Sequence, residues 1–88
     1  MADTDLYPTP ARLALLRDVE SGRVYDSADA VPMLDLGDEP HARVADAIWA
    51  MGRAGWVELD PPAGFSRGKR WPWRLTDVGR TVLEAGAP

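Results

Sequence analysis

Four basic side chains near the C-terminus are the residues of this chain best suited to a chemical task. They are Arg67, Lys69, Arg70 and Arg74, and no acidic residue occurs in positions 61–75. Guanidinium and ammonium groups bind phosphate oxygens. Because salt screens charges beyond ~8 Å, a phosphate backbone interacts with a local cluster of charges more than with the net charge of the chain. The cluster therefore predicts contact with a nucleic acid, with an ordinary solvated loop as the alternative.

The charge of the chain is unevenly distributed along it. Its 88 residues carry a net charge of −4, yet positions 1–40 hold nine acidic and three basic side chains, whereas positions 41–88 hold five acidic and seven basic ones. A surface that attracts a polyanion is therefore expected in the second half of the chain.

Other kinds of site find little support in the sequence. There is no cysteine and His41 is the single histidine, which excludes the common Cys/His zinc sites. His41 and Asp46 lie five positions apart, an offset that does not align two side chains on a helix. A group of acidic residues lacks the ordered spacing of a calcium loop, and we interpret it as a solvated acidic loop. This group consists of Asp26, Asp29, Asp35, Asp38 and Glu39. The sequence predicts no enzyme, no metal and no cofactor.

The length of the chain suffices for one domain. Residues 1–8 are expected to form a flexible N-terminal arm, and residues 9–86 the folded domain. The longest apolar runs are a few residues, so no membrane span is expected. The absence of cysteine fits a cytoplasmic protein.

The elements that would position the basic residues begin with a helix that Thr9 caps and Gly22 ends. Residues 23–25 are β-prone and predict a short strand. The segment 26–38 is ambiguous, because Pro32 falls in the middle of a possible short helix and allows at most a turn or two.

A second helix is predicted over 40–54, with Asp38 as its cap and Gly55 at its end. At 100° per residue, the core-facing and outward arcs of this helix separate clearly. The core-facing arc holds Val44, Ala47, Ile48 and Met51, and the outward arc holds Ala42, Arg43, Asp46, Trp49, Ala50 and Arg53.

Two alternating segments, 56–59 and 71–75, predict a β-hairpin whose long connection carries the basic cluster. Pro72 limits the second strand to an edge or to a position where its N–H is not needed. Thr76 then caps a last helix, over 77–86.

The stretches AMGRAGWVELD and WRLTDVGRTVL resemble the C-terminal half of winged helix-turn-helix regulators of the MarR and PadR type. In those families the recognition helix ends at a glycine, a wing hairpin follows, and the second strand of the wing enters the last helix through an LT step. Residues 52–60 and 73–83 carry this pattern. The resemblance implies an α+β winged helix domain, with three helices, a C-terminal hairpin wing and a short first strand.

The resemblance also implies a function. The helix 40–54 would enter the major groove of double-stranded DNA, and the basic wing 61–74 would follow the backbone or the minor groove. Such a protein would be a transcriptional regulator that acts as a homodimer. The residues expected to contact DNA are His41, Arg43, Arg53, Arg67, Lys69, Arg70 and Arg74.

Trp49 supports a second hypothesis. It lies on the outward arc of the helix 40–54 beside small alanines, and an exposed tryptophan suggests an interface. The alternative function is a protein–protein interaction module that uses this alanine-rich face, with Leu6 and Tyr7 as further interface residues. In the competing structural interpretation, the N-terminal arm or the 26–38 segment covers Trp49.

Overall fold

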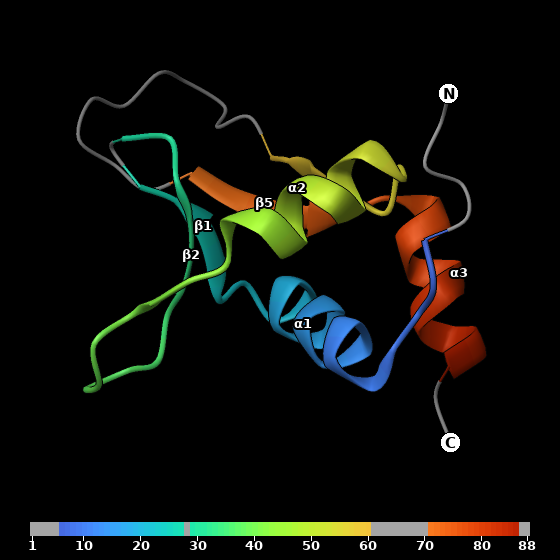
Figure 1. Cartoon of the computed structure of the whole chain (residues 1–88), viewed down its shortest axis with the longest axis horizontal. Coiled ribbons are helices and arrows are strands. Elements are labelled where there is room, and N and C mark those ends of the chain that lie inside the picture. Colours follow the sequence, from blue (N-terminus) through green and yellow to red (C-terminus); the bar gives the residue numbers. More distant parts are fainter. Residues whose placement is uncertain (1–5, 28, 61–70, 87–88) are drawn as a thin grey trace.

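The structure, a computed structural model, describes residues 6–27, 29–60 and 71–86. These residues form three helices and five strands (Figure 1). In chain order they are α1 (Pro10–Glu20), β1 (Val24–Asp26), β2 (Pro32–Leu34), β3 (Ala42–Arg43), α2 (Ala45–Arg53), β4 (Val57–Leu59), β5 (Trp71–Leu75) and α3 (Asp77–Gly86). None of the helices in this described part is long and apolar enough to cross a lipid bilayer.

The first helix begins and ends where the sequence predicts. The Thr9 hydroxyl accepts a hydrogen bond from the backbone N–H of Arg12 at 3.2 Å. Pro10 occupies the first turn, where its missing N–H costs nothing. Gly22 follows the helix with a φ of 82°, in the left-handed region that favours glycine. The helix packs through Leu16, which is completely buried.

The segment 26–38 contains a strand, and no positioning helix precedes α2 in its described residues. β2 pairs antiparallel with β1 on one side and with β3 on the other. Pro32, the first residue of β2, has no N–H and disfavours a helical conformation in the residue before it. Its carbonyl accepts a hydrogen bond from the Val44 N–H at 3.0 Å. Strand pairing thus provides backbone hydrogen bonds for a segment that is a poor helix former.

The predicted start of the second helix is wrong, because α2 begins at Ala45 rather than at residue 40. The residues Ala42–Arg43 pair with β2 as strand β3. Val44 occupies the N-cap position and makes no side-chain hydrogen bond there. The local helix-start signal at Asp38 was overridden by hydrogen bonds to a strand that lies earlier in the chain.

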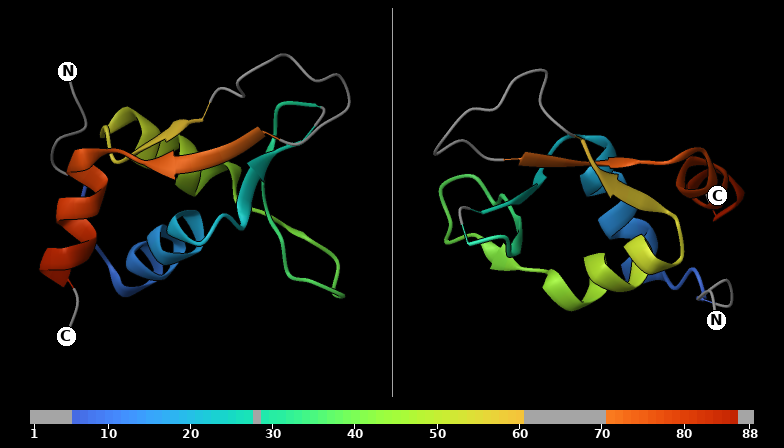
Figure 2. Two further views of the ribbon diagram at one scale, coloured as in Figure 1. Left: turned by 180° about the vertical axis from the view of Figure 1, so that it is seen from behind. Right: turned by 90° about the horizontal axis from the view of Figure 1, so that it is seen from above.

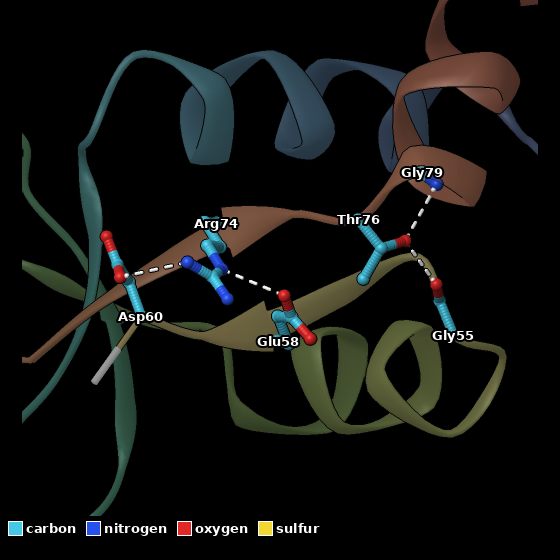
Figure 3. Close-up of polar contacts among 6 residues, drawn as sticks. All are labelled: Gly55, Glu58, Asp60, Arg74, Thr76 and Gly79. Atoms are coloured by element: carbon cyan, nitrogen blue, oxygen red, sulfur yellow. Dashed lines mark hydrogen bonds and ion pairs between the residues drawn. The ribbon is translucent and has the colours of Figure 1, made fainter.

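The turn from α2 into β4 is tied to the turn from β5 into α3 (Figure 3). The Thr76 hydroxyl donates to the Gly55 carbonyl and accepts a hydrogen bond from the Gly79 N–H at 3.0 Å. Gly79 lies so close to the backbone of Trp56 that a Cβ there would overlap the Trp56 carbonyl. The first turn of α3 is therefore held against the residue that leads into β4.

The five strands form one antiparallel sheet in the order β3-β2-β1-β5-β4. One face of this sheet meets α1 and α2, and α3 follows at the end of β5 (Figure 2). The core between them is apolar and contains Leu15, Leu16, Val19, Val24, Ile48, Met51, Trp56, Val57, Leu75 and Leu83. No described helix lies over the opposite face.

The predicted winged helix fold is wrong. The structure is α+β, but its helices alternate with strands, and its sheet has five strands instead of a C-terminal hairpin joined by one short first strand. The difference arises from β2 and β3, which extend the sheet beyond β1 where the prediction had only a linker and the start of a helix.

Candidate interaction surface

The hairpin of β4 and β5 carries an exposed cluster of charges on the sheet face opposite the helices (Figure 3). The Nε atom of Arg74 lies 2.8 Å from Glu58 Oε2, and its Nη1 atom lies 3.2 Å from Asp60 Oδ1. All three side chains are about half exposed. Arg74 was predicted to contact DNA as part of a basic patch. Its two carboxylate neighbours leave the described part of the hairpin with one unit of net negative charge.

His41 lies in the connection between β2 and β3 and not on a helix. Its Nδ1 atom is 2.6 Å from the Tyr25 hydroxyl oxygen, and its Nε2 atom is 3.1 Å from Asp35 Oδ1. Asp35 Oδ1 also accepts a hydrogen bond from the Gly37 N–H at 2.8 Å. Both ring nitrogens of His41 are therefore engaged within the protein, and the residue ties the β2–β3 connection to β1.

The other predicted DNA contacts do not gather with Arg74. Arg43 is exposed on β3, which β2 and β1 separate from β5 in the sheet. Arg53 is exposed at the last residue of α2. The three remaining basic residues, Arg67, Lys69 and Arg70, lie outside the described residues. The described members of the predicted set thus form no single basic patch.

α2 presents a tryptophan to solvent. The inner side of the helix buries Ala45, Ile48 and Met51, whereas Trp49 is 41% exposed. The described residues of the arm and of the 26–38 segment therefore leave this part of its surface uncovered. The interpretation of Trp49 as an outward residue is confirmed.

A second exposed apolar side chain, Leu59, lies on the strand that follows α2. A short turn follows α2, so that β4 runs back alongside the helix (Figures 1 and 3). A Cβ at Gly52 would lie 3.9 Å from the Val57 carbonyl oxygen, which fixes where helix and strand meet. Leu59 is 36% exposed. We call the exposed side chains of Trp49 and Leu59 the α2–β4 surface.

The N-terminal candidates differ from each other. Leu6 packs against the core, whereas Tyr7 is 77% exposed. The Tyr7 carbonyl accepts a hydrogen bond from Arg12 Nη1 at 2.9 Å, which holds this segment to α1. Leu6 therefore belongs to the fold, and Tyr7 stays a candidate interface residue.

A buried contact that the sequence did not indicate joins β1 to β5. Asp26 is only 6% exposed, and its Oδ1 atom accepts a hydrogen bond from Trp73 Nε1 at 2.7 Å. The interpretation of Asp26 as part of a solvated acidic loop is wrong. No three His, Asp or Glu side chains of the described residues come close enough together to hold a metal ion.

A shallow groove of about 300 Å³ lies between α1 and the start of α2. Its walls are mostly apolar and comprise Ala11, Arg12, Ala14, Leu15, Asp18, Leu34, Val44 and Ala47. Small-molecule sites need several polar groups that converge on the ligand, and only Arg12 and Asp18 are available here.

No protein-family model, curated protein or solved structure matches this chain. The resemblance to MarR and PadR regulators consequently depends on residues 52–60 and 73–83 alone. Function has to be inferred from the surface of the chain itself.

Proposed function

We propose that this protein is an interaction module that binds a partner protein through the α2–β4 surface. The exposure of Trp49 is the observation that carries this proposal. A tryptophan offers a large apolar area, and tryptophans are enriched among the residues that dominate binding energies at protein interfaces. Leu59, on the strand that follows α2, is a second exposed apolar side chain.

The charges near the α2–β4 surface favour a protein over DNA. On the outward side of α2, Asp46 and Arg53 carry opposite charges, and both are exposed. On the hairpin, two carboxylates surround Arg74. Affinity for DNA grows with the number of phosphates that cations neutralise, and this combination offers no excess of cations.

The test is a selection of peptides from a random display library on the immobilised full chain. We expect selected peptides to contain apolar residues, and to lose roughly thirtyfold or more in affinity when Trp49→Ala is introduced, because a hot-spot residue supplies about 2 kcal/mol or more. Val78→Ala is the matched control, since Val78 is an exposed apolar residue of α3. Selected peptides that bind the Trp49→Ala protein as tightly as the wild type contradict the proposal.

Binding to double-stranded DNA is the second candidate, and one observation of the sequence favours it. The segment 61–70 contains Arg67, Lys69 and Arg70 without an acidic residue. Neutralising three phosphates predicts a slope of about −2.7 in a plot of log affinity against log salt concentration. Replacing all three residues with Ala should remove the salt dependence. Absence of binding to random duplex DNA at low salt excludes this candidate.

A homodimer and a cytoplasmic location complete the proposal. A chain without cysteine suits a reducing compartment, and association of two copies would double the contacts of a small module. Light scattering on the purified chain tests the dimer, and a single species of monomer mass contradicts it.

A further inference from the structure

The outward side of α2 carries a charged group at each end and an apolar side chain between them. Asp46 lies in the first turn of the helix and Arg53 is its last residue, and both are exposed. Trp49, which is 41% exposed, and the half-buried Ala50 lie between them. These residues follow one another at intervals of three or four positions. They therefore share one face of the helix, because an α-helix repeats about every 3.6 residues.

α2 lies on the outside of the molecule. It lies in front of the sheet in Figure 1 and along the outer margin of the right view of Figure 2. The described elements pack against its inner side, where Ile48 and Met51 are completely buried. Its outward face is consequently open to another molecule along the whole length of the helix.

The order of charges on this face is complementary to that of a second copy lying antiparallel to it. Asp46 lies as many residues before the midpoint between Trp49 and Ala50 as Arg53 lies after it. A twofold axis at this midpoint reverses one helix relative to the other and places each Asp46 opposite an Arg53. In a parallel pair, each charge would instead lie opposite its like. Arg53 also has a contact within its own chain, but a guanidinium has five N–H donors and can serve both partners.

The middle of the face suits close packing of two helices. The methyl side chain of Ala50 allows the helix axes to approach to roughly 8 Å. The twofold axis keeps the two copies of Trp49 on the same side of the contact, so their indoles meet near the axis. Such an aromatic pair buries a large apolar area that is exposed in the single chain.

We propose that two copies of this chain pair through antiparallel α2 helices, about a twofold axis that passes between Trp49 and Ala50. Two ion pairs between Asp46 and Arg53 set the direction of the helices, and the two indoles supply the apolar contact. One pair of short helices buries less area than a standard interface, so the dissociation constant is on the order of micromolar or weaker. This inference depends on the proposed protein-interaction function and names a second copy of the chain as the partner that Trp49 contacts.

The test measures self-association of the full chain by sedimentation velocity, from roughly 1 μM to 1 mM. Asp46→Arg and Arg53→Asp should each weaken self-association about tenfold or more, because each reversal acts twice across the axis and places like charges opposite each other. An equimolar mixture of the two variants should restore dimers, because the basic positions of one chain then face the acidic positions of the other. High salt should weaken association of the wild type.

Matched charge reversals on the other two helices serve as controls. Asp77→Arg reverses an exposed charge in the first turn of α3, and Arg17→Asp reverses one in the last turn of α1. Both alter the charge at a helix end as the test variants do, and both should leave self-association within about twofold of the wild type, because salt screens distant charges. Circular dichroism establishes that each variant is folded, and Asp46→Asn and Arg53→Gln serve as a milder pair.

A cross-link locates the axis independently of charge. The chain has no cysteine, so Ala50→Cys introduces a single thiol beside the proposed axis. Mild oxidation should convert this variant to a disulfide-linked dimer, because the two thiols lie near each other. Val78→Cys, at an exposed position of α3, should stay largely monomeric under the same conditions. Equal cross-linking of the two variants contradicts the proposed axis.

The possible results distinguish this inference from the function on which it depends. A chain that stays monomeric up to roughly 1 mM overturns the pairing of α2, and leaves the interaction module standing if selected peptides still require Trp49. Self-association that is indifferent to both charge reversals, or a mixture that does not restore dimers, overturns the antiparallel arrangement. Self-association and peptide binding that are both indifferent to Trp49→Ala overturn the proposed function itself.

Discussion

Each end of the sheet is held together by its own polar contacts, and the two sets differ in how deeply they are buried. Where β1, β2 and β3 meet, the Tyr25 hydroxyl, the His41 ring and the Asp35 carboxylate form a chain, and Tyr25 is only 9% exposed. On the β4–β5 hairpin, Arg74 and its two carboxylate partners are about half exposed. Water can replace a lost hydrogen bond at the exposed second end, whereas at the first end it reaches Asp35, which is 35% exposed, more readily than the Tyr25 hydroxyl. The first chain of contacts therefore contributes more to the fold than the second.

The largest effect of breaking a polar contact is expected between these ends, where Asp26 is buried against Trp73. Trp73→Phe keeps an aromatic ring but removes the indole N–H that donates to Asp26. A buried carboxylate that loses its donor costs about 3 kcal/mol, so the free energy of unfolding in urea should fall by about that amount. Adding Asp26→Asn should recover part of the loss, since a neutral amide is less costly to bury. A loss as small as that of an exposed ion pair would remove the distinction between buried and exposed contacts.

Tyr25→Phe should have an intermediate effect. It removes the hydroxyl that lies 2.6 Å from His41 Nδ1 and leaves a partly buried ring nitrogen without its partner. We expect a loss of about 1–2 kcal/mol in the free energy of unfolding. Tyr7→Phe is the control, because Tyr7 is 77% exposed and its change should stay within about 0.5 kcal/mol. Equal effects of the two substitutions would show that the Tyr25–His41 contact adds nothing to the fold.

Elements set by local signals could be predicted from the sequence, and elements set by pairing with distant strands could not. α1, β4, β5 and α3 follow from local signals, such as the Thr9 cap before α1 and the left-handed glycine at position 55 after α2. β2 and β3 could not be predicted, because they depend on pairing with β1 rather than on their own residues. The helix-start signal at Asp38 was therefore misleading.

The candidate site shows a similar limit. The 100° periodicity of the predicted helix placed Trp49 on its outward side, and its exposure agrees. The ion pairs of Arg74 with Glu58 and Asp60 were missed. Counting charges along positions 61–75 excluded Glu58 and Asp60, which the antiparallel register brings opposite and beside Arg74. Charge along the chain is a poor guide to charge across strands.

Arg74→Gln is expected to have the smallest effect on stability. It tests most directly whether the exposed contacts of the β4–β5 hairpin contribute less to the fold than the Tyr25–His41–Asp35 contacts. Exposed ion pairs contribute between 0 and about 1 kcal/mol, so the free energy of unfolding should change by less than that. The substitution leaves Glu58 and Asp60 without their cation, but both carboxylates are about half exposed and water can solvate them. Arg80→Gln, which breaks the exposed ion pair between Arg80 and Glu20 on α3 and α1, should have an equally small effect. If Arg74→Gln instead destabilised the protein as much as Tyr25→Phe, the hairpin charges would stabilise the fold as much as the Tyr25–His41 contact does, and the difference between the two ends of the sheet would disappear.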